Sequence, residues 1–357
     1  MIKLLVVDDS ALMRRQLMNL FQAEGEFEIR QARNGDEAVR ENREFQPDVV
    51  TLDINMPEMD GLTALSLIMA ERPVAVVMVS SLTNEGALVT FEALNLGAVD
   101  YVAKPGGTIS LSIDRVAEEL LAKVRSAARA RPRGKTSVGA TVARRMQEER
   151  RKASQVAAAL AEPRGSIEGL LVMGASTGGP RALEIVLSGL HVNFPWPVVV
   201  AQHMPAAFTR AFAERLDQCC GLRVVEAASA LALEPGKIYI GRGGADTILA
   251  SRAGRLSVLA APENAKYLWH PSVELLGRSA LEHYDAKRIT AVLLTGMGYD
   301  GSDAFAEIKK RGGRTIAESE ESAVVYGMPA ELVRKSGASL VLPAERIATQ
   351  LNVWAGR

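Results

Sequence analysis

The stretch GLLVMGASTGGPR, residues 169–181, decides the fold of the second half of the chain. Its apolar run Leu170–Met173 is too short for a helix and lies between glycines, which is typical of a buried strand. The turn Gly174–Gly179 follows, and Pro180 suits the first position of a helix, where its missing N–H costs nothing. Ser176 is therefore expected at a strand-to-helix turn, near unpaired backbone donors and a positive helix end. Such a turn can activate a nucleophilic hydroxyl or hold a phosphate.

The composition is that of an ordinary globular protein. The 357 residues suffice for two or three domains, and the 42 basic residues balance the 42 acidic ones, which argues against a general nucleic-acid or membrane binder. No apolar run approaches the roughly 20 residues needed to span a membrane, and the chain starts with a strand-like run instead of a signal peptide. Cys219 and Cys220 lack the spacing of a zinc site. We expect a cytoplasmic monomer that is not embedded in a membrane and does not bind nucleic acid.

Residues 1–106 alternate strand-like apolar runs with amphipathic stretches, and this pattern predicts a parallel sheet flanked by helices. The clearest strands are expected at Lys3–Val7, Val49–Leu52, Val74–Val79 and Tyr101–Val102, and the helices at Met13–Ala23, at Gly35–Phe45 and after Gly61. In such folds the ligand site lies beyond the carboxyl ends of the strands.

Chemically useful side chains collect at the predicted strand ends, namely Asp8, Asp9, Asp53, Ser80 and Lys104. Three carboxylates at one point repel each other unless a cation lies between them, and Mg²⁺ prefers such oxygen ligands. With the metal and Lys104 neutralising charge, the carboxylate of Asp53 can attack a phosphoryl donor. The alternative, that the Asp pair caps a helix and the Lys is a surface charge, does not explain why all of them occupy strand ends.

This segment resembles the response-regulator receiver domain over essentially its whole length, in the motifs VVDDS (6–10), LDINMPEMDG (52–61), MVSSLT (78–83) and DYVAKP (100–105). The resemblance implies a flavodoxin-like, doubly wound domain. It also implies that Asp53 is the phosphoacceptor and that Asp8 and Asp9, with Asp53, hold Mg²⁺.

The same resemblance implies a phosphorylation switch in which Lys104 is the cationic partner of the phosphoryl group and a hydroxyl senses it. Ser80 and Ser81 can both fill the hydroxyl position, and we favour Ser80. The phosphodonor implied is a histidine kinase.

Residues 107–166 are expected to link two domains, with the last receiver helix at 114–129. Between Lys123 and Arg164 the chain has twelve Lys or Arg against three Glu. This charge pattern favours a solvated, partly helical, basic linker, with a docking segment for an acidic partner as the alternative. A nucleic-acid role is disfavoured because no aromatic residues are interleaved for stacking.

Residues 167–357 repeat the alternation and predict a second doubly wound α/β domain whose sheet is parallel in its centre. We expect strands at Leu170–Met173, Val198–Ala201, Lys237–Ile240, Ile289–Leu294 and Leu340–Leu342, and helices at Arg181–Leu187, Thr209–Gln218, Val273–His283 and Ser302–Arg311. Ser176, His203 and Asp300 each follow one of these strands, so the carboxyl edge of the sheet brings them together.

A serine hydroxyl is a weak nucleophile that needs a His base, and the imidazole needs a carboxylate to fix its tautomer. Ser176, His203 and Asp300 fill these roles, while the backbone N–H groups around Thr177 and Met297 are candidate oxyanion donors. The order Ser…His…Asp differs from that of α/β-hydrolases, and GASTGG is not their G-x-S-x-G elbow.

Two alternatives remain beside this triad. His270 can face the same cleft as His203, although only His203 directly follows a buried strand. The glycine-rich turn can bind a nucleotide, although GASTGG matches neither G-x-G-x-x-G nor a P-loop. We therefore favour hydrolysis over nucleotide binding.

The second domain resembles the catalytic domain of chemotaxis protein-glutamate methylesterases in GASTGG (174–179), AQHMPAAFTRAFAERL (201–216), LLTGMGYDG (293–301) and SAVVYGMP (322–329). The resemblance covers nearly all of residues 167–350, and receiver, linker and esterase follow in that family's order. It implies a Rossmann-like domain with the triad Ser176, His203 and Asp300 and with Met297 in the oxyanion hole. The loops GRGGAD (241–246) and WHPSVE (269–274) and Tyr299 depart from the usual pattern, at positions that concern substrate preference.

The implied reaction is hydrolysis of glutamate methyl esters on chemoreceptor helices to glutamate and methanol, and in some members deamidation of receptor glutamines, with no cofactor in the esterase site. Phosphorylation of Asp53 is expected to loosen the receiver from the esterase cleft and to raise kcat/KM. A non-enzymatic response regulator would lack the Ser–His–Asp set. An esterase acting on a non-chemotaxis methylated protein stays open, because a triad does not name its substrate.

Overall fold

The computed structural model describes residues 1–80, 84–104, 113–130 and 167–356. The chain divides into two compact units, Met1–Ser137 and Val138–Arg357, and each is described here by itself. The stretch predicted as a basic linker, residues 107–166, lies outside the described residues except for one helix and the two residues after it.

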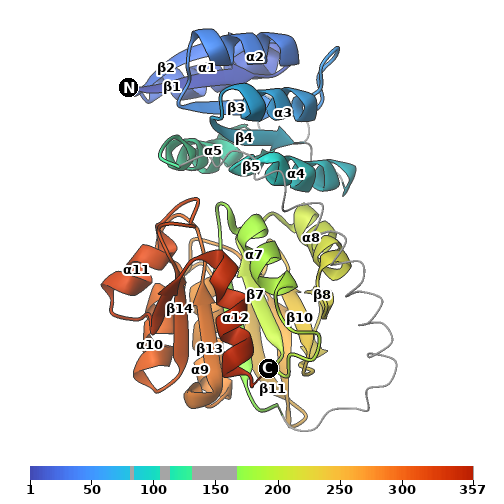
Figure 1. The fold of residues 1–357 in the computed structure, drawn as a ribbon, viewed down its shortest axis with the longest axis vertical. Coiled ribbons are helices and arrows are strands. Elements are labelled where there is room, and N and C mark those ends of the chain that lie inside the picture. Colours follow the sequence, from blue (N-terminus) through green and yellow to red (C-terminus); the bar gives the residue numbers. More distant parts are fainter. Residues whose placement is uncertain (81–83, 105–112, 131–166, 357) are drawn as a thin grey trace. The chain divides into compact units, whose positions relative to one another are not determined.

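In the first unit, the described strands form a five-stranded parallel sheet in the order β2-β1-β3-β4-β5 (Figure 1). Helix α1 packs against α5, while α3 lies between α2 and α4, so helices cover both faces. This is the predicted flavodoxin-like order, whose switch point lies between β1 and β3. The elements are β1 Ile2–Val7, α1 Ala11–Ala23, β2 Phe27–Ala32, α2 Gly35–Glu44, β3 Val49–Asp53, α3 Gly61–Glu71, β4 Ala75–Ser80, α4 Asn84–Leu96, β5 Asp100–Ala103 and α5 Ile113–Ala128.

Local sequence explains where these helices begin. Side-chain oxygens of Ser10, Asn34 and Asp60 accept backbone N–H groups in the first turns of α1, α2 and α3. Each cap satisfies a donor that the helix itself leaves unpaired. Because Ser10 comes three residues after β1 ends, its cap also fixes how Asp8 and Asp9 leave the sheet.

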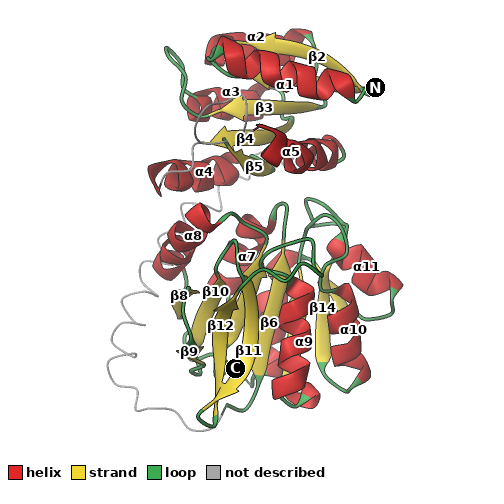
Figure 2. Ribbon diagram, turned by 180° about the vertical axis from the view of Figure 1, so that it is seen from behind, coloured by secondary structure: helices red, strands yellow, loops and turns green. Residues whose placement is uncertain are grey.

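In the second unit, the described strands form a seven-stranded sheet, parallel throughout, in the order β15-β14-β13-β6-β7-β10-β8. Helices α7, α8 and α12 pack on one face, and α9, α10 and α11 on the other (Figures 1 and 2). Strands β6, β7 and β13 are buried along their whole length, as expected for strands covered on both faces. These elements are β6 Leu170–Ala175, α7 Gly179–Ser188, β7 Val198–Gln202, α8 Ala206–Cys219, β8 Arg223–Ala227, β10 Lys237–Gly241, α9 Val273–His283, β13 Ile289–Leu293, α10 Ser302–Lys310, β14 Arg314–Glu318, α11 Met328–Arg334, β15 Leu340–Leu342 and α12 Ala344–Trp354.

A small antiparallel sheet, which the sequence pattern did not predict, completes the described part of this unit. It has the order β11-β12-β9, with β9 at Leu231–Ala232, β11 at Asp246–Arg252 and β12 at Arg255–Ala261. Helix α9 packs against β11 on one side and against β6 and β7 on the other. The small sheet therefore holds the helix whose first turn reaches the carboxyl edge of the large sheet.

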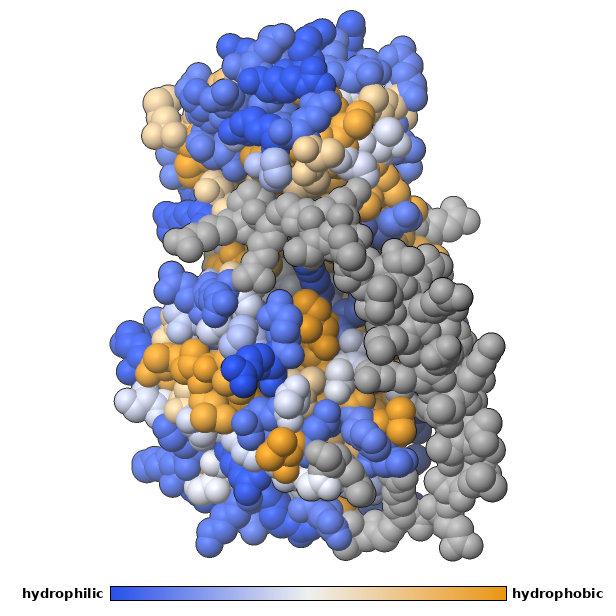
Figure 3. Space-filling view, viewed as in Figure 1, coloured by the Kyte–Doolittle hydropathy of each residue, from blue (hydrophilic) through white to orange (hydrophobic). Residues whose placement is uncertain are grey.

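The described surface carries scattered apolar side chains, as most globular domains do. On the face drawn in Figure 3, hydrophilic side chains cover much of the first unit, and apolar ones appear in patches on the second. None of the helices in the described ranges has the length and apolar character to cross a membrane.

Candidate active site

The predicted acidic cluster is present at the carboxyl edge of the first sheet. Lys104 Nζ lies 2.9 Å from Asp8 Oδ2 and 2.7 Å from Asp53 Oδ2, and both carboxylates are buried. Asp9 is exposed, yet one carboxylate oxygen from each of the three Asp lies within 4.8 Å of the others. Three converging oxygen donors fit a hard divalent cation.

Charge is concentrated in this cluster. Burial raises the pKa of the Asp53 carboxyl, Lys104 opposes that rise, and Asp8 adds to it, so the pKa of Asp53 lies above its usual value. Burial lowers the pKa of Lys104, but its contacts with Asp53 and Asp8 outweigh burial and raise it. The ammonium of Lys104 is therefore held in its charged form between the two carboxylates.

The hydroxyl predicted to sense a phosphoryl group lies outside the described residues. Ser80 is the last residue of β4, which lies between β3 and β5. Its side chain, and the whole of Ser81, lie outside the described residues. The choice between these two serines stays a prediction.

In the second unit, Ser176 lies where β6 passes into α7, as its sequence predicts. Gly178 precedes the helix with a φ of 75°, which favours glycine, and a Cβ there would lie 2.6 Å from Val324 Cβ. A Cβ on Gly179 would lie 2.0 Å from Gln202 Oε1. The two glycines therefore let this turn pack directly against neighbouring loops, with Ser176 partly exposed.

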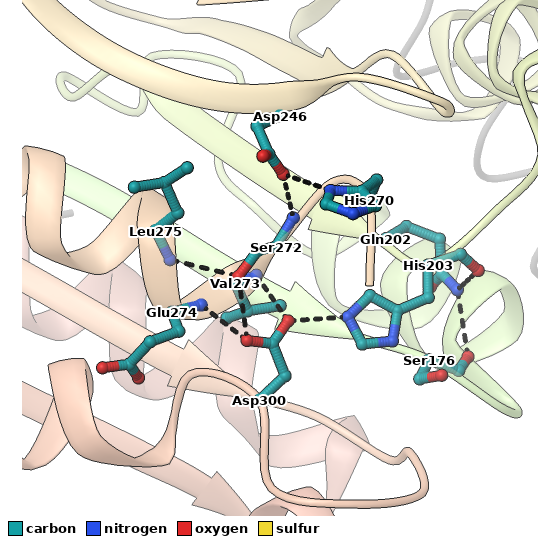
Figure 4. A network of polar contacts seen from close by, with 10 residues as sticks. All are labelled: Ser176, Gln202, His203, Asp246, His270, Ser272, Val273, Glu274, Leu275 and Asp300. Carbon is teal, nitrogen blue, oxygen red and sulfur yellow. Dashed lines mark hydrogen bonds and ion pairs between the residues drawn. The ribbon is translucent and has the colours of Figure 1, made fainter. Parts of the chain in front are cut away.

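His203 follows β7 directly and its Nε2 lies 2.8 Å from Asp300 Oδ2. Asp300 also accepts hydrogen bonds from Val273 N at 2.7 Å, Glu274 N at 2.9 Å and Ser272 Oγ at 3.0 Å. These donors belong to the first turn of α9 and its cap, so the positive end of that helix faces the carboxylate (Figure 4). Burial disfavours a charged Asp300, but His203 and these backbone donors outweigh it and lower the pKa of Asp300.

The second ring nitrogen of His203 is the one available to a nucleophile. With Nε2 bonded to a carboxylate, Nε2 carries the proton and Nδ1 keeps its lone pair. Nδ1 is buried and has no hydrogen-bond partner among the described residues. Figure 4 shows Ser176 on the side of the ring away from Asp300. In the chymotrypsin triad, Nδ1 bonds the carboxylate and Nε2 faces the serine. Here the two nitrogens have the opposite roles.

In the part of the chain that the structure describes, the backbone around Ser176 has two N–H groups without an acceptor. Ser176 N donates to Thr295 O at 3.0 Å, and Thr295 Oγ1 donates to Thr177 O at 2.9 Å, which joins the two loops. Within the described ranges, the N–H groups of Thr177 and Met297 donate to no acceptor. The residue before Met297 is Gly296, where a Cβ would lie 2.7 Å from Ser176 Cβ. Both predicted oxyanion donors therefore lie on loops that touch the serine.

The competing histidine has a different carboxylate. His270 Nδ1 lies 2.9 Å from Asp246 Oδ1, and Ser272 N donates to the same oxygen at 3.1 Å. Ser272 thereby joins this pair to Asp300, which its hydroxyl contacts. Of the two candidate bases, His203 is the one paired with Asp300.

Three residues make contacts in the site that the sequence did not predict. The Trp269 ring stacks on the His203 ring, with 5.4 Å between centroids and 5° between planes, and Tyr299 meets the indole edge-on. Gln202 Nε2 donates to Ser176 O at 3.0 Å and to His203 O at 2.9 Å. The only sequence signal for Gln202 was its place directly before His203, at the end of a predicted strand.

Comparison with known proteins gives matches over both units. A family model described as CheB methylesterase matches residues 171–351, and the response regulator receiver domain matches residues 4–113. Protein-glutamate methylesterase/protein-glutamine glutaminase 3 of Rhodospirillum rubrum is 55% identical, with 100% of this chain and 97% of the relative covered. Protein-glutamate methylesterase/protein-glutamine glutaminase 2 of Rhodopseudomonas palustris is 52% identical, with 99% of this chain and 98% of the relative covered. The solved CheB methylesterase catalytic domain of Thermotoga maritima superposes with a TM-score of 0.51 at 37% identity, covering 53% of this chain and 100% of that one.

Proposed function

Because the chain belongs to the CheB methylesterase family and is a protein-glutamate methylesterase with a receiver domain, we propose that Ser176, His203 and Asp300 carry out its hydrolysis. The observation that carries this assignment is the His203–Asp300 contact of 2.8 Å, which leaves Nδ1 on the side of Ser176 without a partner among the described residues. The substrates are glutamate methyl esters on the cytoplasmic helices of chemoreceptors.

In the first half of the reaction, Ser176 Oγ attacks the ester carbonyl carbon while its proton passes to His203 Nδ1. The carboxylate of Asp300 stabilises the imidazolium so formed. The N–H groups of Thr177 and Met297 donate to the oxyanion, and one such donor contributes about 2.7–4 kcal/mol to the transition state. Collapse of the intermediate returns the proton to the leaving oxygen and releases methanol.

In the second half, water attacks the glutamyl ester on Ser176. His203 takes a proton from the water and returns it to Ser176 Oγ, and glutamate is released. An amide can follow the same course, with ammonia leaving in place of methanol. Deamidation of receptor glutamines is therefore a second proposed activity, favoured by the glutaminase activity in the names of both curated relatives.

The first unit supplies the control of this hydrolase. Asp53 is the proposed phosphoacceptor, with Ser80 and Lys104 as switch residues and a histidine kinase as phosphodonor. The oxygens of Asp8, Asp9 and Asp53 would hold Mg²⁺, which when bound neutralises charge during phosphoryl transfer. Lys104 Nζ lies 2.7 Å from Asp53 Oδ2 and can therefore form an ion pair with a phosphoryl group added there.

The proposal is tested by methanol release from membranes that contain methylated chemoreceptors, with and without a phosphodonor. We expect methanol in proportion to the methyl esters lost, at a higher rate with the phosphodonor. Membranes with unmethylated receptors should release none. Absence of methanol from a folded, phosphorylated enzyme would contradict the substrate, and release from another methylated protein would then favour the non-chemotaxis alternative.

Asp53→Asn should abolish the stimulation by phosphodonor and leave the basal methanol release, because the amide cannot accept a phosphoryl group. Asp36→Asn is the matched control, since it removes an exposed carboxylate from the same unit and should keep full stimulation. Both variants are assayed for methanol with a saturating phosphodonor. An Asp53→Asn protein that is stimulated as strongly as the wild type would remove Asp53 from the switch.

A further inference from the structure

The side chain of Gln202 bridges the two residues that the reaction must bring together. Gln202 is the last residue of β7 and is 2% exposed. Its Nε2 donates to the carbonyl oxygens of Ser176 and His203, at 3.0 and 2.9 Å (Figure 4). Because both acceptors are carbonyl oxygens, the amide must present its NH₂ group to them, and both of its hydrogens are used.

The sheet alone does not tie these residues together. The ladder between β6 and β7 ends at the pair Ala175–Gln202, followed by one hydrogen bond from His203 N to Ala175 O. Ser176 lies beyond the last paired residue of its strand. The Gln202 amide extends the connection by one residue, to the carbonyl of the nucleophile itself.

The Gln202 amide carries an energetic penalty. Gln202 Oε1 is buried and has no partner among the described residues, and an unsatisfied buried acceptor costs about 1–3 kcal/mol. Gly179 leaves space for this oxygen, since a Cβ there would lie 2.0 Å from it. An apolar side chain would pack at this position without that penalty, so the donors are the reason for an amide here.

We propose that Gln202 is a positioning residue, which fixes the loops of Ser176 and His203 relative to each other so that the hydroxyl can reach Nδ1 for proton transfer. This inference rests on the proposed triad. Proton transfer needs a separation of about 2.6–3.2 Å between donor and acceptor, and a misplacement of about 1 Å can lower a rate about 100-fold. Without the bridge, both carbonyls lose a buried donor and the two loops are free to separate.

The test is Gln202→Met, which keeps the length of the side chain and removes both donors. We expect kcat for methanol release to fall about 10- to 100-fold with KM unchanged, because Gln202 acts through the two loops and not on the ester. Labelling of Ser176 by a fluorophosphonate, a reagent specific for activated serines, should slow by a similar factor. A purely structural role would move neither quantity per folded molecule.

Gly179→Ala is the second variant. It keeps the Gln202 amide, but its Cβ would clash with Gln202 Oε1 at 2.0 Å and displace the amide. It should lower kcat and the labelling rate in the same direction. Thr315→Val is the control: it removes a buried hydrogen bond of 2.6 Å to Gly337 O from β14, away from the carboxyl edge, and should lower the melting temperature but not kcat.

The outcomes separate this proposal from the triad. If Gln202→Met keeps kcat and the labelling rate within twofold of the wild type, or if Thr315→Val loses as much kcat, the positioning role is wrong while the triad stands. If the wild-type enzyme itself is not labelled at Ser176, the triad fails first. If Gln202→Met does not fold, Gly179→Ala decides by the same two rates.

Discussion

Ser176→Ala should lower kcat for methanol release by about 10⁴- to 10⁶-fold. The substitution removes the proposed nucleophile, so no acyl-enzyme should form, and only the proposed oxyanion donors and substrate binding remain to assist attack by water. Methanol is measured from the same methylated receptor membranes for the wild type and the variant. Fluorophosphonate labelling of the variant should also be lost.

The fold should not change with this substitution. The hydrogen bonds that hold Ser176 are made by its backbone, from its N–H to Thr295 O and to its carbonyl from Gln202. The free energy of unfolding is therefore expected within about 0.5 kcal/mol of the wild type. Ser188→Ala, in the helix that follows, is the matched control and should keep full activity. Wild-type methanol release by Ser176→Ala would remove Ser176 from the reaction.

The edge of the sheet that carries the site could be predicted because buried parallel strands have a clear sequence pattern. The runs Leu170–Ala175 and Val198–Ala201 are continuously apolar, and the polar residues directly after them stand out. Parallel strands then bring these residues to one edge. This pattern is sufficient to predict that Ser176, His203 and Asp300 lie at that edge.

Two of the edge strands, β2 and β8, could not be predicted by the same pattern, although the edge strands β5 and β15 were. Strand β2, Phe27–Ala32, is largely exposed between its buried ends, because it lies at the margin of its sheet. Strand β8, Arg223–Ala227, lies at the margin of the other sheet and mixes exposed and buried residues. A strand with one open side has no need of a continuous apolar run.

The contacts that support the proposed triad could not be predicted from the sequence either. Asp300 accepts hydrogen bonds from the backbone N–H groups of Val273 and Glu274. Because every residue type except proline has such a group, no sequence pattern identifies these donors. The stack of Trp269 on His203 joins residues far apart in the chain through the loop before α9. Both features follow from where α9 is held, which the unpredicted antiparallel sheet helps to determine.

Asp300→Asn should lower kcat by about 10⁴-fold while the active-site residues keep their places. The carboxylate accepts a hydrogen bond from the N–H at His203 Nε2, which keeps the proton there and leaves Nδ1 as the base. An amide that turns its NH₂ toward Nε2 favours the other tautomer, with the proton on Nδ1, and Ser176 then has no acceptor for its proton. The measurement is kcat for methanol release across pH, with Asp303→Asn as the matched control, since Asp303 is exposed and lies on the next helix, α10.

The same substitution should change how stability depends on pH. The folded pKa of Asp300 lies below its ordinary value of 3.8, so its charge stabilises the fold above about pH 4 and that contribution is lost as pH falls through the lowered folded value. Asp300→Asn replaces hydrogen bonds to a charged group, each contributing about 1.5–3 kcal/mol, by bonds to a neutral one. At pH 7 the variant should therefore unfold more easily, and below pH 4 the difference from the wild type should shrink. A variant with wild-type kcat, or a difference in stability that grows on acidification, would mean that Asp300 does not act as the buried anion of the triad.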